Sequence, residues 1–156
     1  MCERVIHTLD INDLLARFFQ AYDDKDWQTM QNCLCDEVFA DYSSFRDAPA
    51  ARMSGAQYVE QRRKAFDPLH MQHDFTNLRV ELDPDGRSAT ARCNYAVHRF
   101  LPSLDGIEGH CHAYGRYFFG LANVYGEWRI SWIIQNVVHF NGNRDSHGAV
   151  GSYRAD

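Results

Sequence analysis

Residues 110–140 read HCHAYGRYFFGLANVYGEWRISWIIQNVVHF. Aromatic and β-branched residues dominate this stretch, and such residues favour strands. The Tyr-Gly-Glu triplet at residues 125–127 divides it into two long runs, residues 110–125 and 128–140. A connection this short joins antiparallel neighbours. The segment therefore predicts a long β-hairpin.

Two further strands are predicted before this hairpin. Residues 73–82 and 88–100 are joined by Asp83-Pro84-Asp85-Gly86, a turn in which glycine supplies the positive φ that such turns often need. Four long strands with short connections predict an antiparallel meander.

The first third of the chain has a helical pattern. Asp10 is a candidate cap for a helix that extends to about Asp24. The apolar side chains of this segment recur at the spacing of one helical face, namely Leu14, Leu15, Phe18, Phe19 and Tyr22.

Shorter elements follow this first helix. Asp26 is a candidate cap for a helix over residues 27–34, and residues 38–42 have a strand pattern. A capping box at residues 54–57 starts a third helix that ends near residue 66, before a proline. Helices followed by a mostly antiparallel sheet indicate an α+β fold. Because helices must cover one face of a long curved sheet, we expect a deep pocket between the two.

Composition limits the functions that are open to this chain. It has 156 residues, a formal net charge of −5 and 45% apolar residues, which suits a single domain with its own core. The negative charge argues against binding to nucleic acid or to an anionic membrane surface. The five cysteines are scattered, and no long apolar segment is present, so we expect a cytoplasmic protein with reduced thiols.

Two residues of the first helix are candidates for chemistry. Tyr22 and Asp23 lie four residues after Phe18 and Phe19, so both fall on the apolar stripe. A carboxylate that faces a core is costly unless it is paired. The alternative is that the helix frays here and Asp23 reaches water.

Histidines supply the second set of candidates. His73 and His98 lie on neighbouring predicted strands, and an imidazole near a carboxylate can transfer protons near neutral pH. His110 and His112 share one strand face, which allows a metal site as an alternative. We expect no metal there, because the first third is helical and no matching glutamate follows.

Several segments together resemble scytalone dehydratase, a member of the SnoaL-like or nuclear-transport-factor-2-like superfamily. The segments are Tyr-Asp-Asp-Lys-Asp-Trp at 22–27, Asp-Tyr-Ser-Ser-Phe at 41–45, Gln-His at 72–73, the strand histidine at 98, and Gly-His-Cys-His at 109–112. Their order is that of the family, and the resemblance extends from about Leu14 to Gly126. It implies a cone-shaped, curved mixed sheet wrapped around N-terminal helices, with a deep pocket.

The resemblance also implies roles for individual residues. Tyr22 and Tyr42 would hold a water that polarises a substrate carbonyl. His73 would move the proton next to that carbonyl, and Asp23 with His98 would form a supporting pair. The implied pocket wall includes Phe45, Phe75, Ala113 and Gly115. Ala113 and Gly115 stand where the family has Ser and Asn, so two contacts are lost and Gly115 is expected to enlarge the pocket.

We therefore expect a single domain over residues 1–156, with a core at about 10–141 and a polar tail at 142–156. The implied activity is a cofactor-independent lyase that removes water from a small hydrophobic cyclic hydroxy-ketone. The alternatives are a SnoaL-like isomerase or cyclase, an accessory subunit, and a non-catalytic binder of small ligands. The resemblance also implies a homodimer or homotrimer.

Overall fold

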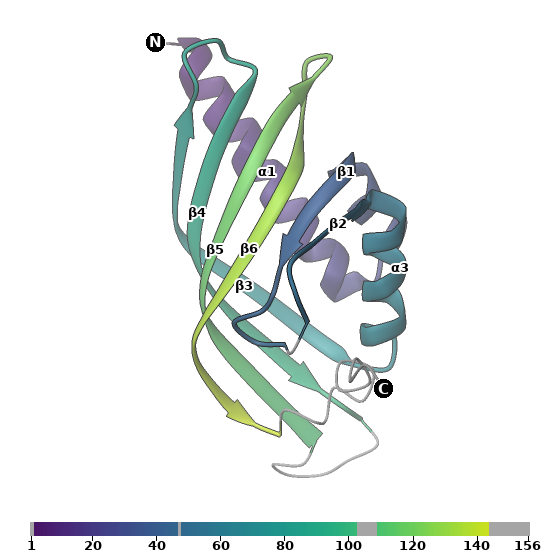
Figure 1. Ribbon diagram of the computed structural model, residues 1–156. Helices are drawn as coiled ribbons and strands as arrows, with labels where there is room; N and C mark the ends of the chain where they lie inside the picture. Colours follow the sequence, from purple (N-terminus) through teal and green to yellow (C-terminus); the bar gives the residue numbers. More distant parts are fainter. Residues whose placement is uncertain (1, 47, 103–108, 144–156) are drawn as a thin grey trace.

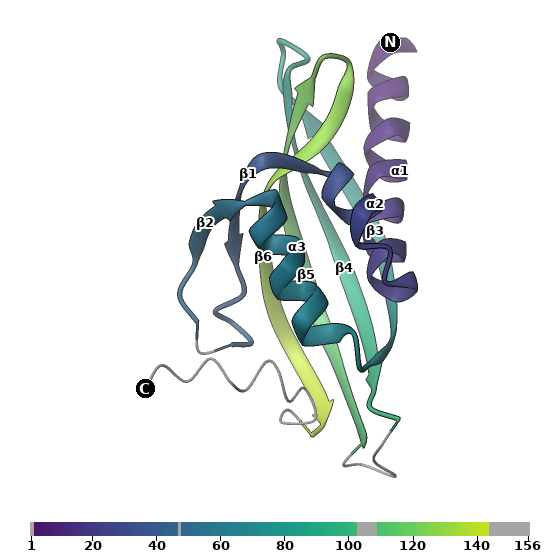
Figure 2. The ribbon, with the colours of Figure 1, turned by 90° about the vertical axis from the view of Figure 1, so that its right-hand side faces the viewer.

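A computed structural model describes residues 2–46, 48–102 and 109–143. It contains three helices that lie on one side of a curved six-stranded sheet (Figures 1 and 2). The helices are α1 (Cys2–Asp24), α2 (Trp27–Asn32) and α3 (Gly55–Phe66). The strands are β1 (Leu34–Asp41), β2 (Ala51–Ser54), β3 (His70–Leu82), β4 (Ser88–Phe100), β5 (His110–Val124) and β6 (Glu127–Gly142). The expected α+β class is confirmed.

The sheet has the order β2-β1-β6-β5-β4-β3. Strands β3 to β6 form the predicted antiparallel meander, while β1 pairs with β6 in parallel. The short strand β2 was not predicted. It is four residues long, none of its side chains is fully buried, and it lies at the sheet edge beside β1, so its sequence carries no burial pattern.

Helix α1 begins at Cys2, not at Asp10 as the capping pattern indicated. Residues 2–9 contain no glycine or proline that would end the helix, and Glu3 lies in its first turn, where a negative charge is favourable. Val5, Ile6 and Leu9 are exposed in these extra turns. The first turns therefore lack the one-sided apolar pattern on which the sequence prediction depended.

The other helix starts and the apolar stripe are confirmed. The Asp26 side chain accepts a hydrogen bond from the Thr29 backbone N–H, and Ser54 and Gln57 form both bonds of the capping box. Phe18 and Phe19 are buried against Phe119, with ring centroids 6.4 and 6.1 Å away. The stripe thus fixes α1 against the inner face of the sheet. No helix in the described segments is both long enough and apolar enough to cross a membrane.

Gly115 does not enlarge the interior, contrary to expectation. A Cβ built on this residue would lie 2.0 Å from the backbone oxygen of Asn136 and 2.9 Å from the Tyr95 ring. The pairing between β5 and β6 shifts its register at this point, so β6 approaches more closely than it would beside a side chain.

Gly115→Ala is expected to destabilise the protein by about 1–3 kcal/mol, because the added methyl group overlaps a backbone atom that cannot rotate away. Urea unfolding measures this change. Arg116→Ala, on the exposed face of the same strand, serves as the control and should stay within about 0.5 kcal/mol of wild type. Equal stability of the two variants would contradict the close approach.

Candidate functional site

Asp23 and His73 form a hydrogen-bonded contact between the end of α1 and the start of β3. The Oδ1 atom of Asp23 lies 2.6 Å from Nδ1 of His73, and its Oδ2 accepts the His73 backbone N–H at 2.9 Å. The His73 side chain is 3% exposed and that of Asp23 is 22% exposed. Both carboxylate oxygens therefore hold one residue, which fixes the imidazole in position.

The same contact favours one tautomer of His73. A carboxylate accepts hydrogen bonds, so the contact favours the hydrogen on Nδ1 and the lone pair on Nε2. Burial lowers the pKa of His73, and the charge of Arg99 acts in the same direction, while the bond to Asp23 opposes both. A neutral imidazole with a free Nε2 lone pair is a general base.

Tyr22 and Tyr42 meet through the hydroxyl of Tyr58. The Tyr58 oxygen lies 2.7 Å from that of Tyr22 and 2.6 Å from that of Tyr42. All three residues are buried, and the ring centroid of Tyr22 is 4.8 Å from that of His73. The resemblance implied a water held by Tyr22 and Tyr42; here a side-chain hydroxyl bridges them directly.

This tyrosine trio is a hydrogen-bond donor. Three hydroxyl groups carry three hydrogens, and the two internal bonds use two of them, so one hydrogen remains for another oxygen. Burial, reinforced by the neighbouring hydroxyls, raises the pKa of Tyr22, Tyr42 and Tyr58. The trio therefore stays neutral near pH 7 and can donate to an oxygen that gains negative charge.

Three arginines complete the interior, and sequence reasoning did not select any of them. The guanidinium carbon of Arg62 lies 4.4 Å from the ring centroids of both Tyr42 and Tyr58. Those of Arg46 and Arg99 lie 5.6 and 5.5 Å from the ring centroid of Phe66. Signals for two of them existed. Arg62 is four residues after Tyr58 on one helix face, and Arg99 alternates with the inward residues of β4.

His98 is outside this cluster, so the expected pair with Asp23 is wrong. Residues 95, 97 and 99 of β4 are buried, and strand alternation places residue 98 on the opposite face. There its Nδ1 lies 3.1 Å from Nδ1 of His112, and its Nε2 lies 3.8 Å from a carboxylate oxygen of Asp74. Asp23 pairs with His73 instead.

The alternative prediction of a metal site concerned His110 and His112. Their rings stack with centroids 4.8 Å apart, and His112 faces away from the interior with His98. Within residues 2–46, 48–102 and 109–143, no group of three or more His, Cys, Asp or Glu side chains could hold a metal ion.

The four predicted pocket residues have different surroundings. Phe45 is buried 5.8 Å from the Arg99 guanidinium carbon, and Ala113 is buried on the inward face of β5. Phe75 packs on Phe19, with ring centroids 5.4 Å apart. Gly115 faces inward, but Tyr95 and β6 fill the space beside it. Most of the expected polar tail, from residue 144 onwards, lies outside the described residues.

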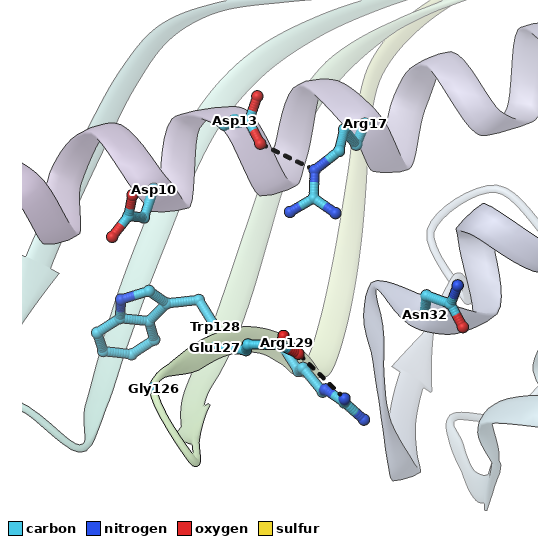
Figure 3. A pocket seen from close by; sticks show the side chains of 8 residues that line it. All are labelled: Asp10, Asp13, Arg17, Asn32, Gly126, Glu127, Trp128 and Arg129. Atoms are coloured by element: carbon cyan, nitrogen blue, oxygen red, sulfur yellow. Dashed lines mark hydrogen bonds and ion pairs between the residues drawn. The ribbon is translucent and has the colours of Figure 1, made fainter.

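A separate surface hollow of about 480 Å³ lies between α1 and the turn that joins β5 to β6 (Figure 3). Its charged groups are largely paired with one another. Arg17 contacts Asp13 at 2.8 Å, and Arg129 contacts Glu127 at 3.3 Å. No histidine is among the described residues that line it, whereas the Asp23–His73 pair supplies an imidazole.

The lowered pKa of His73 predicts a loss of stability in mild acid. Above about pH 6.5 the imidazole is neutral in both folded and unfolded chains. Below that value the unfolded chain binds a proton that the folded protein resists, so the free energy of unfolding falls until the folded pKa is reached.

Urea unfolding at pH 7.5 and 5.5 measures this loss. His73→Gln should reduce it, while His70→Gln, at an exposed position of the same strand, should not. The pKa of His112 is also lowered by burial and by His98, so its contribution is measured separately with His112→Gln. A wild-type pH dependence that His73→Gln leaves unchanged would contradict the neutral imidazole.

The helix-covered, curved mixed sheet and its element order define a nuclear-transport-factor-2-like α+β protein. Residues 3–134 match the SnoaL-like domain. The chain therefore belongs to the SnoaL-like family, which confirms the resemblance read from the sequence motifs.

Similar proteins include enzymes of distant homology. The scytalone dehydratase of Colletotrichum orbiculare is 23% identical over 156 residues, covering 90% of this chain and 82% of that protein. The crystal structure of the Kfla4162 protein from Kribbella flavida has a TM-score of 0.84 at 19% identity, covering 90% and 96%. A type 2 hexachlorocyclohexane dehydrochlorinase (LinA) has a TM-score of 0.76 at 13% identity, covering 91% and 92%. These two structures establish the fold alone.

Proposed function

We propose that this protein is a cofactor-independent lyase that eliminates water from a small cyclic hydroxy-ketone. The observation that carries the proposal is the buried His73 imidazole, which is fixed by Asp23 at Nδ1 and lies beside the tyrosine trio. The distant scytalone dehydratase relatives support the reaction class.

The chemistry follows from the positions of these groups. Nε2 of His73 takes the proton from the carbon next to the carbonyl, and the electrons of that C–H bond form an enolate. The spare hydrogen of the tyrosine trio is donated to the enolate oxygen, which carries the new negative charge. The enolate then expels the β-hydroxyl group, which receives the proton from His73 and leaves as water. The product is an enone, and the reaction needs no metal or organic cofactor.

The test is turnover of a panel of cyclic β-hydroxy-ketones, with and without a ring carboxylate, followed by ultraviolet absorbance of the conjugated product and by mass spectrometry. The proposal predicts loss of one water from at least one compound. Rearrangement without loss of mass would favour an isomerase or cyclase. Binding without any change would favour a non-catalytic role.

Tyr58→Phe tests the tyrosine trio. The variant removes the central hydroxyl and leaves two buried hydroxyls without their partner, so the free energy of unfolding should fall by about 1–3 kcal/mol. The kcat should fall about tenfold, which corresponds to a loss of ~1.4 kcal/mol of transition-state stabilisation. Tyr125→Phe, at a fully exposed position, is the control for both measurements. A wild-type kcat in Tyr58→Phe would show that the tyrosine trio takes no part in the mechanism.

A further inference from the structure

The interior holds an excess of positive charge. Arg62 and Arg99 are 3% and 5% exposed, and the Nε atom of Arg46 is also buried. In the part of the chain that the structure describes, none of these three arginines forms an ion pair with a carboxylate. The Asp23 carboxylate is already bound to His73. Buried charges without partners are costly, so this arrangement requires an explanation.

Of the three arginines, Arg62 lies nearest to aromatic rings. It lies against the faces of the Tyr42 and Tyr58 rings, each at 4.4 Å, a geometry in which aromatic rings attract a cation. It therefore has a structural role, because it supports two members of the tyrosine trio.

The buried charge of Arg99 has no aromatic contact as close as those of Arg62. The guanidinium carbon of Arg99 is 5.5 Å from the ring centroid of Phe66 and 5.8 Å from that of Phe45, at the outer limit of a cation–π contact. Its Nε and Nη1 atoms are buried and have no hydrogen-bond partner among the described residues. The hydroxyl of Tyr95, which faces inward from the same strand, is also buried and has no hydrogen-bond partner within residues 2–46, 48–102 and 109–143.

Arg46 adds a second positive charge beside the Phe66 ring. Its guanidinium carbon lies 5.6 Å from the centroid of that ring, which Arg99 also contacts, and 5.1 Å from the centroid of the Tyr42 ring. Burial lowers the pKa of Arg46 to about 10, and the charges of Arg62 and Arg99 contribute to this shift. Like charges repel, so two guanidinium groups beside one ring favour an anion between them.

We propose that Arg99, assisted by Arg46 and the Tyr95 hydroxyl, binds the carboxylate of an anionic cyclic substrate. The assignment to a substrate rests on the proposed function, because the anchor lies in the same interior as His73. A carboxylate suits a guanidinium, whose planar fork can donate two parallel hydrogen bonds. A ring suits the walls, since Phe45, Phe66 and Tyr95 are aromatic and buried. The substrate class is thus a hydroxy-ketone ring that bears a carboxylate.

The test is calorimetric titration of the full chain with benzoate, with its neutral counterpart benzamide, and with inorganic phosphate. We expect wild type to bind benzoate at least tenfold more tightly than benzamide and to bind phosphate weakly. Arg99→Gln should lose at least tenfold in benzoate affinity and keep its benzamide affinity. Arg92→Gln removes an arginine from the exposed face of the same strand and should bind both compounds as wild type does.

Three results would overturn the proposal. One is equal affinity of wild type for benzoate and benzamide, a result that does not depend on any variant folding. Another is unchanged benzoate binding in Arg99→Gln. The third is phosphate binding as tight as benzoate binding, because it would show a general anion site.

The same titrations separate this proposal from the proposed function. His73→Gln should bind benzoate like wild type. Benzoate binding through Arg99 without dehydration of any panel compound would leave the carboxylate anchor standing and overturn the lyase. If the protein dehydrates a neutral hydroxy-ketone but binds benzoate no more tightly than benzamide, the lyase stands and the carboxylate anchor is overturned.

Discussion

His73→Gln is expected to lower kcat/KM for dehydration by about 10²–10⁴-fold, the usual contribution of a positioned general base. Glutamine retains a side-chain amide that can donate to Asp23, but it has no lone pair with the basicity of Nε2. The loss should therefore appear in kcat, while KM and benzoate affinity stay close to wild type. Steady-state kinetics on the best compound of the panel measure the effect.

The matched control is His70→Gln, which changes an exposed histidine three residues earlier on β3. Its kinetics should equal those of wild type. If His73→Gln keeps more than a tenth of wild-type kcat/KM, another group abstracts the proton and the proposed mechanism is wrong.

Asp23→Asn should reduce kcat/KM by about 10³-fold or more, although the side chain keeps its size. An amide can turn its NH₂ group toward Nδ1, and the imidazole then carries its hydrogen on Nε2, where it cannot act as a base. The variant also loses the carboxylate charge that opposes the lowering of the His73 pKa by burial.

Asp24→Asn is the control, since Asp24 is the exposed neighbour at the end of the same helix. Circular dichroism and urea unfolding of Asp23→Asn show whether the fold survives the loss of the bond to the His73 backbone N–H. A folded Asp23→Asn protein with wild-type kcat/KM would show that the carboxylate does not set the tautomer.

Much of the fold followed from local pattern. The stripe on α1, the two caps and the turns of the meander depend on neighbouring residues in sequence, and all are present in the structure. The N-terminal turns of α1 and the edge strand β2 were missed because neither buries a regular face. Their extent depends on tertiary neighbours that a single sequence does not display.

The candidate site was predictable only in part. Tyr22 and Asp23 were identified because polar groups on an apolar stripe need a partner, and the structure supplies one for each. His98 was misplaced because a shift of one residue along a strand moves a side chain to the other face. Tyr58 and the buried arginines were missed because each is an ordinary amphipathic residue in sequence, and their meeting depends on how α3 and β4 pack.

The proposed mechanism requires His73 to be a neutral imidazole with its hydrogen on Nδ1. Nitrogen-15 NMR of histidine-labelled protein tests this directly, with the His73 signals assigned by their absence from His73→Gln. We predict a protonated Nδ1 and an unprotonated Nε2 at pH 7, and a pKa below the ordinary value of about 6.5. A hydrogen on Nε2 with none on Nδ1, or an imidazolium that persists above pH 7, would show that His73 is not the general base.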